Sequence, residues 1–482
     1  MASVKGNIVL NLINTGLGLL FPVITFPYVS RILMPEGIGL IQFYQSIINY
    51  IILFSALGIP LYAVREIARL RDDINSLNKA TVEILLLHSI LSLIAYCIVL
   101  VLCFTVDKIH TDWKLFLILS ISIFFNVIGI PWFYQAIEEF KYITLRSLII
   151  RCISLISLFL FVKSSSDLYL YALILIGGQV GNFGLNFYRL RKYHVFRNVK
   201  VGDLSLKRHL HASVRIFILN VAISLYININ PIMLGFMTNA ACVGYYTAVT
   251  RIINVANGIT TSIGAVILPR LSNYYATGKW TSYNLLKNKT LDLINLICLP
   301  ISCCLIAISP IFIPLFAGDA YYPSINTLII SAPTLLISAL NYIIAIQILY
   351  TQNKENSVIF ATISGGCLNV ILNVILIPHL QQNGTAISGL LAELTVLVVC
   401  LILGHKNINY NFFNKNNLQA IGLSVVCGCL CWFINKIELP KISLIIIDII
   451  AVFIFYTVSL LLLRNNIIIE YKIILLNRIR NL

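Results

Sequence analysis

Two arginines of this sequence lie deep inside apolar stretches. Arg251 is about eleven residues into its stretch, so at 1.5 Å per helical residue it would lie roughly 16 Å deep. Arg151 would lie roughly 12 Å deep, with Ser147 and Ser154 on its helix face. Neither arginine has an acidic residue three or four positions away. Because a guanidinium in hydrocarbon costs at least about 2.5 to 3.5 kcal/mol, the pattern predicts a hydrated cavity or an anionic ligand.

The chemistry of the guanidinium favours one class of anion. Its planar fork matches phosphate oxygens with two hydrogen bonds, so a phosphate or pyrophosphate is the expected ligand of Arg151 and Arg251. The alternative is a structural ion pair with Glu393, which would lie at a similar depth. A carboxyl in that position could also carry a proton, so Glu393 is a candidate for ion coupling.

Small and polar residues recur at helical spacing around these charges. The stripe that contains Arg251 repeats at steps of three and four residues, and three other apolar stretches carry shorter stripes. The residues expected to line a cavity are Asn11, Asn14, Gln42, Ser46, Asn49, Asn220, Ser224, Thr247 and Asn254. Such stripes face protein or water, so they predict a polar cavity between two lobes, with hydrogen bonding in a static bundle as the alternative.

The elements that position these residues are predicted to be membrane helices. Of 482 residues, 59% are hydrophobic and only 11% are charged, whereas soluble domains carry about 25% charged residues. Apolar runs long enough to cross a bilayer, about 17 to 25 residues each, recur along the whole chain. The predicted spans are 8–29, 38–63, 80–103, 114–137, 143–162, 168–188, 215–236, 240–268, 290–317, 324–350, 357–378, 384–403, 418–434 and 443–463.

The distribution of Lys and Arg predicts that both termini are cytoplasmic. With the N-terminus inside, 26 of the 34 basic residues fall in inside loops and tails, Arg146 among them, and 6 fall outside, including Arg31 and Lys108. The net charge of +16 does not indicate nucleic-acid binding, because the basic residues lie in short loops between spans.

The longest basic loop divides the predicted spans into two sets of six. We expect an N-terminal six-helix lobe at 1–190, a basic cytoplasmic linker at 191–214 and a C-terminal six-helix lobe at 215–404, followed by two additional helices and a cytoplasmic tail at 405–482. An internal repeat supports this division, because GLIQFYQSIIN from Gly39 resembles GYYTAVTRIIN from Gly244. An offset of six spans gives both lobes the same orientation, as in parallel-repeat transporters.

Other features point away from enzymatic or metal chemistry. Cys427, Cys429 and Cys431 fan around a helix without His or carboxylate neighbours, so we expect packing and no metal or cofactor. Asp448, in the last span, is expected to reach the membrane interface. The chain has no phosphate-binding loop for ATP, and its outside loops are too short for a large external domain, so we expect no enzyme activity.

Five stretches share their pattern with one family. They begin with FPYVSRILMPEGIGLIQFYQSIINY at Phe26 and continue with GIPLYAVREIARLRDD, PWFYQAIEEFKYITLRSL, ILPRLSNYYATG and LNVILNVILIP. Through these stretches, spread over roughly residues 1 to 405, the sequence resembles the polysaccharide transport family, the Wzx-type flippases of O-antigen and capsule repeat units. One departure is Ala136, which follows Gln135 where the family usually has glycine.

The resemblance implies the fold of the multidrug and oligosaccharidyl-lipid exporter superfamily. The chain is then an all-α polytopic membrane protein of about 14 transmembrane helices: two MATE-like six-helix bundles that open alternately to each side, plus two extra C-terminal helices. The implied substrate is an undecaprenyl-pyrophosphate-linked oligosaccharide, flipped from the cytoplasmic to the periplasmic leaflet of the bacterial inner membrane. In this cavity Arg31, Arg151 and Arg251 would hold the pyrophosphate, with a role as an interfacial anchor as the alternative for Arg31, which is expected near the external end of its helix.

The resemblance also sets the expected partners and the alternatives. Membrane lipids, a polysaccharide polymerase and its chain-length machinery are expected partners beside the lipid-linked substrate. The alternatives are a MATE-like drug or cation antiporter and a flippase of a lipid-linked peptidoglycan precursor. A cation antiporter would need acidic residues in its cavity, whereas the predicted cavity is cationic.

Overall fold

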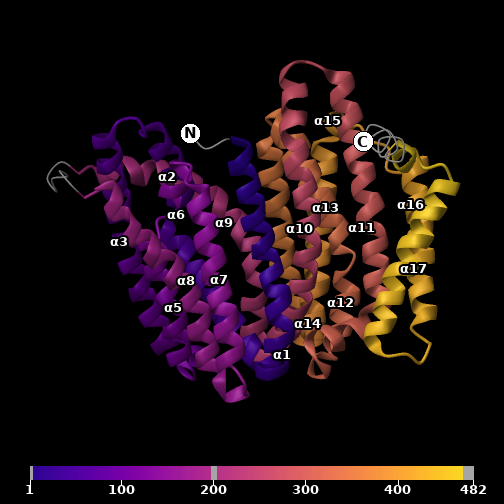
Figure 1. The fold of residues 1–482 in the computed structure, drawn as a ribbon, viewed down its shortest axis with the longest axis horizontal. Helices are drawn as coiled ribbons and strands as arrows, with labels where there is room; N and C mark the ends of the chain where they lie inside the picture. Colours follow the sequence, from indigo (N-terminus) through magenta and orange to yellow (C-terminus); the bar gives the residue numbers. More distant parts are fainter. Residues whose placement is uncertain (1–3, 197–203, 471–482) are drawn as a thin grey trace. The chain divides into compact units, whose positions relative to one another are not determined.

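The computed structural model describes residues 4–196 and 204–470, and over these ranges the chain is helical without any strand. The chain forms two compact units, Met1–Gly244 and Tyr245–Leu482. Figure 1 shows the helices of each unit as long rods. The division into lobes at 190 and 214 stays a prediction.

The first unit contains nine helices in the described residues and the start of a tenth. They are α1 (Val4–Ala56), α2 (Ile59–Arg69), α3 (Ile74–Thr105), α4 (Asp107–His110), α5 (Trp113–Ile128), α6 (Pro131–Ala136), α7 (Phe140–Phe161), α8 (Leu168–Leu190), α9 (Leu206–Met237) and α10 (Ala240–Ala276). Within the unit, α5 and α7 pack against α8, and α1 packs against α3, α7 and α9.

The second unit contains the rest of α10 and the C-terminal helices. They are α11 (Trp280–Ala317), α12 (Ser324–Ser331), α13 (Thr334–Tyr342), the π-helix η5 (Ile343–Leu349), α14 (Glu355–Leu403), α15 (His405–Ile408), α16 (Lys415–Ile434) and α17 (Lys441–Leu462). The last two, yellow in Figure 1, pack against each other and against α11.

Two helices are too long to be single spans. At 1.5 Å per residue, the 53 residues of α1 would extend about 80 Å, more than twice the roughly 30 Å of a hydrocarbon core. Non-helical backbone at Met34 (φ 58°, ψ 175°) breaks α1, and Gln381 (φ 51°, ψ −129°) breaks the 49-residue α14 in the same way. Each of these helices therefore supplies two spans.

The expected number of spans is confirmed. Eleven helical segments in the described residues are long and apolar enough to cross a membrane. Counting α1 and α14 twice, and adding the 32-residue α9, gives fourteen. The second predicted span was too long at its end, because α1 stops at Ala56 and Gly58 (φ 76°) turns the chain into α2.

Two short helices of the first unit, α2 and α6, pack against each other. Proline occupies an early position in each, Pro60 in α2 and Pro131 in α6, where the missing backbone N–H costs no helical hydrogen bond. Ile59 of α2 and Phe133 of α6 are fully buried in one apolar cluster. The α2–α6 pair therefore forms part of the packed core of this unit.

The expectation for Asp448 is wrong. Its side chain is 2% exposed and lies with Cys304 and Cys431 along a cavity between α11, α16 and α17. The reason is the packing of the C-terminal pair, since the side of α17 that carries Asp448 faces α11 and α16. Cys427 and Cys431 are buried in the same region, and Cys429 is exposed.

A buried carboxylate anchors the start of α9 to α3. Glu83 Oε2 accepts hydrogen bonds from Arg208 Nη2 and His209 Nε2, both at 2.7 Å, and Glu83 Oε1 accepts one from the Ser205 backbone N–H at 2.8 Å. The side chains of Glu83 and His209 are fully buried, and Tyr62 of α2 contacts the other ring nitrogen of His209 at 2.7 Å. We call these residues the Glu83 cluster.

Glu83→Gln should destabilise the protein, because an amide can satisfy only part of the cluster and leaves a buried donor without an acceptor. We expect a loss of about 1 to 3 kcal/mol in the free energy of unfolding. Thermal unfolding of the detergent-purified protein measures it. The control is Asp72→Asn, since the Asp72 side chain is 98% exposed. Equal stability of both variants would show that the Glu83 cluster contributes nothing.

Candidate functional site

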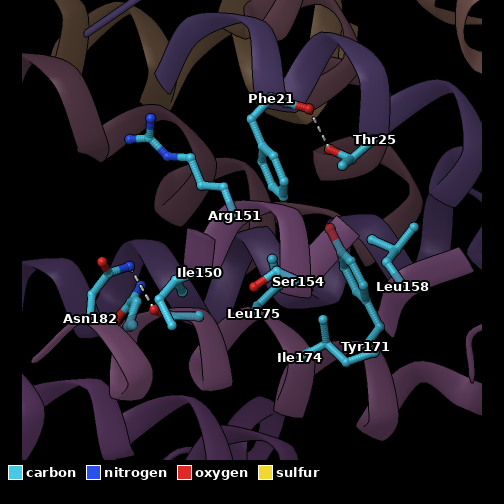
Figure 2. A pocket seen from close by; sticks show the side chains of 12 residues that line it. Phe21, Thr25, Ile150, Arg151, Ser154, Leu158, Tyr171, Ile174, Leu175 and Asn182 are labelled. Carbon is cyan, nitrogen blue, oxygen red and sulfur yellow. Dashed lines mark hydrogen bonds between the residues drawn. The ribbon is translucent and has the colours of Figure 1, made fainter. Parts of the chain in front are cut away.

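The first unit contains a pocket of about 180 Å³ that includes Arg151 (Figure 2). We call it the Arg151 pocket. It is lined from α1 by Phe21 and Thr25, from α7 by Ile150, Arg151, Ser154 and Leu158, and from α8 by Tyr171, Ile174, Leu175, Gly178, Gln179 and Asn182. None of these residues is acidic, so the charge of the lining is positive.

Glycines allow the three helices to approach one another around the pocket. A Cβ atom at Gly178 of α8 would lie 2.9 Å from Ser154 Oγ, and one at Gly18 of α1 would lie 3.4 Å from Arg151 Nη2. A side chain at Gly18 would therefore occupy the space beside the guanidinium. The small residues let α1 and α8 come close to α7 at the depth of Arg151.

Arg151 is held by a neutral acceptor. Its Nη1 donates to the backbone carbonyl of Asn14 at 3.0 Å, and the Asn14 side-chain oxygen accepts from Ser147 Oγ at 2.8 Å. In the described residues no carboxylate forms an ion pair with Arg151. Figure 2 shows its guanidinium extending away from Tyr171. A guanidinium has five N–H donors, so most of its capacity remains for an anion.

A second arginine of α7 was misplaced by the sequence analysis. The count of basic residues includes Arg146 with the inside loops, although the predicted span 143–162 contains it; the structure places it within α7, only 9% exposed. Its Nε donates to Asn182 Oδ1 at 3.1 Å and its Nη1 to Asn186 Oδ1, while the guanidinium lies 5.2 Å from the centre of the Tyr142 ring. Asn182 also lines the Arg151 pocket, so the two arginines share a neighbour.

A signal for this site was present in α8. Gly178, Asn182 and Asn186 repeat every four residues and therefore lie on one helix face. The stripe alone does not reveal its neighbour Arg151, because the contact between α7 and α8 depends on how the two helices pack.

The predicted residues in the second arm of α1 are outside the Arg151 pocket. Gln42 Nε2 donates to Ser46 Oγ at 3.3 Å, and Ser46 is buried. Asn49 is exposed. In the first arm Arg31 is exposed and its Nη1 donates to the Pro27 carbonyl of the same helix. The structure therefore does not bring Arg31 and Arg151 into one pocket.

Four of the predicted residues lie in the second unit. On α10, Thr247 is buried, Arg251 is half-buried and Asn254 is exposed. On α14, Glu393 is half-buried and its Oε2 accepts from Asn341 Nδ2 at 2.6 Å. The roles assigned to these residues, as to the rest of the predicted site, stay predictions.

Three predicted cavity residues cannot be placed. The side chains of Asn11, Asn220 and Ser224 lie outside the described residues, although the helices α1 and α9 continue through these positions.

Replacing Arg151 by Met should leave thermal stability unchanged or raise it. A charge without a carboxylate partner lowers stability in an apolar bundle, and a flexible apolar side chain of similar length can fill its place. Unfolding of the purified variant tests this. The matched control is Arg208→Met, which should cost about 1 to 3 kcal/mol because it removes a donor from buried Glu83. A similar loss for both variants would make Arg151 a structural residue.

Comparison with known proteins identifies the relatives of this chain. Residues 4–275 match the family described as "Polysaccharide biosynthesis protein". A "Putative O-antigen transporter" of Escherichia coli (strain K12) is 25% identical over 421 residues, which cover 84% of this chain and 97% of that protein. The "Uncharacterized membrane protein EpsK" of Bacillus subtilis (strain 168) is 22% identical over 443 residues, 86% of each chain. The resemblance found in the sequence is confirmed.

Solved structures show the same fold. The lipid II flippase MurJ in an inward closed conformation superposes with a TM-score of 0.65 at 16% identity, covering 92% of this chain and 98% of that one. An inward-facing MATE family transporter of the MOP superfamily gives a TM-score of 0.62 at 15% identity, covering 81% and 94%. The expected MATE-like architecture is therefore confirmed.

Proposed function

Because the chain belongs to the polysaccharide biosynthesis protein family, we propose that it is a flippase for a lipid-linked oligosaccharide. It would move an undecaprenyl-pyrophosphate-linked repeat unit from the cytoplasmic to the periplasmic leaflet by alternating access. The name of the Escherichia coli relative supports a polysaccharide precursor as substrate. The observation that carries the proposal is the cationic Arg151 pocket, whose lining contains no acidic residue.

The pocket suits a phosphate group better than a cation. A pyrophosphate brings negative charge into the membrane, and the guanidinium of Arg151 can meet it with paired charge-assisted hydrogen bonds. A drug or cation antiporter would need a carboxylate there to offset the charge of its substrate. The lining of the Arg151 pocket offers none. The antiporter is therefore the weaker candidate.

The other charged residues complete the proposal. Arg251 and Arg31 would contact the pyrophosphate at other stages of its passage, and Glu393 would couple transport to an ion. The protein would lie in the bacterial inner membrane with both termini cytoplasmic, where a polysaccharide polymerase receives the flipped unit. A flippase acting on a peptidoglycan precursor would use the same chemistry at its pyrophosphate.

Arg151→Ala should abolish translocation, and Arg151→Lys should restore it only in part, since an ammonium keeps the charge but loses the planar fork. The purified protein is reconstituted in liposomes with a fluorescent undecaprenyl-pyrophosphate oligosaccharide, and a membrane-impermeant quencher reports the outer leaflet. Liposomes with a labelled peptidoglycan precursor are the comparison. Failure to move either lipid would contradict a flippase, and transport of the peptidoglycan precursor alone would favour that alternative.

Arg251→Ala should also abolish export while the protein still accumulates in the membrane, because a lost bidentate contact to phosphate costs several kcal/mol. If Arg251 instead pairs with Glu393, this single change would lower protein abundance. The double variant Arg251→Ala with Glu393→Gln separates the two roles. Full export by the double variant would contradict phosphate binding by Arg251. Polysaccharide export and protein level are measured in the same cells.

A further inference from the structure

Two glycines of the internal repeat lie against each other's helices. Gly39 and Gly244 correspond in the repeat, and the same offset relates Pro35 to Ala240. A Cβ atom at Gly39 would lie 1.7 Å from the carbonyl oxygen of Ala240, and one at Gly244 would lie 2.0 Å from that of Pro35. Gly39 therefore touches the backbone of Ala240, and Gly244 touches the backbone of Pro35, which is the residue that corresponds to Ala240 in the repeat. Such reciprocity is the mark of a local two-fold axis.

This contact, which we call the glycine crossing, lies beside two chain reversals. The second arm of α1 begins at Pro35, directly after the break at Met34. In the same way α10 begins at Ala240, directly after α9 ends at Met237. Only glycine lets two helix backbones come this close.

The crossing also terminates both predicted polar stripes. Gln42 follows Gly39 by three residues on the second arm of α1, and Thr247 follows Gly244 by three residues on α10. Each glycine is therefore one helical turn beyond the residues expected to line the transport path. The Phe43 and Phe236 rings meet edge-on with centroids 5.0 Å apart, which adds an apolar seal next to the glycines.

One lysine beside the glycine crossing binds the end of α9. Lys108 of α4 donates from Nζ to the carbonyl oxygens of Gly235, Phe236 and Thr238, at 2.8, 3.0 and 2.7 Å. These are carbonyls at the C-terminal end of α9, where a cation is favoured by the helix dipole. All three ammonium donors are used, and Tyr44 of α1 donates to the Lys108 carbonyl at 2.8 Å.

We propose that the glycine crossing is the external closure of the transport path and that Lys108 is its latch. The inference rests on the proposed alternating-access function, which requires a seal that can open on this side. The external side follows from the charge distribution, which places Lys108 outside. The contact suits reversible opening because backbone meets backbone across it, and beside it one lysine links the end of α9, through its ammonium, to Tyr44 of α1, through its carbonyl.

Thiol labelling tests the closure without requiring transport. A single cysteine is placed at exposed Asn49 in a cysteine-free background, and a membrane-impermeant maleimide is added to the outside of cells that lack the lipid-linked substrate. Lys108→Met removes three hydrogen bonds and should raise the labelling rate about tenfold, equivalent to about 1.4 kcal/mol of closure. Gly39→Ala and Gly244→Ala should each raise it at least as much, because the added methyl group cannot fit.

The reciprocal geometry gives a sharper expectation for the double variant. Gly39→Ala combined with Gly244→Ala should label scarcely faster than either single variant, because one added methyl already separates the helices. The control is Gly177→Ala, whose Cβ would have no neighbour within 4 Å and which should leave labelling unchanged. Lys108→Met leaves both glycines unchanged, so it still tests the closure if an alanine variant fails to fold.

An unchanged labelling rate in a folded Lys108→Met variant and in either folded alanine variant would contradict the proposed closure. It would show that the glycine crossing is a static helix contact that does not open. That result would leave the proposed function intact, because the substrate takes no part in the assay. Conversely, faster labelling in a protein that moves no lipid-linked oligosaccharide in liposomes would support the closure and contradict the proposed function.

Discussion

The absence of water from the bilayer core is the constraint on which this structure depends. Each backbone N–H and C=O in the core must find a partner within the chain, so the described residues form helices. The same constraint explains the breaks in α1 and α14, because a helix longer than the membrane must reverse where its freed groups can be satisfied. At one reversal, the ammonium of Lys108 donates hydrogen bonds to three backbone carbonyls at the end of α9.

Charged side chains obey the constraint in two different ways. Glu83 is saturated by Arg208, His209 and a backbone N–H, which is what a structural charge requires. Arg146 and Arg151 have amide and carbonyl acceptors instead, and their positive charge is not balanced by any ion pair in the described residues. We expect a guanidinium so placed to lower stability, and the proposed binding of a phosphate would explain why the charge is kept.

Periodicity and composition were enough to predict the number of spans and the repeat that begins at Gly39 and Gly244, because both depend on local sequence. The Arg151 pocket was beyond such reasoning, since it joins α1, α7 and α8. The count of basic residues includes Arg146 with the inside loops although the predicted span 143–162 contains it, and the structure shows that two amides of α8 hold it in a buried position. The burial of Asp448 likewise depends on how α17 packs, and the sequence pattern does not encode that choice.

The repeat is symmetric where the helices cross and asymmetric where chemistry is expected. Gly39 and Gly244 keep the same residue because both backbones meet there, and a side chain on either would separate them. Two turns along each helix, Ser46 corresponds to Arg251, so only one copy carries the charge at this position. The first copy has its cation on another helix, at Arg151 of α7. We expect such a difference in a transporter of the proposed substrate, an asymmetric phosphate-bearing lipid, since two identical halves would present the same groups to both of its ends.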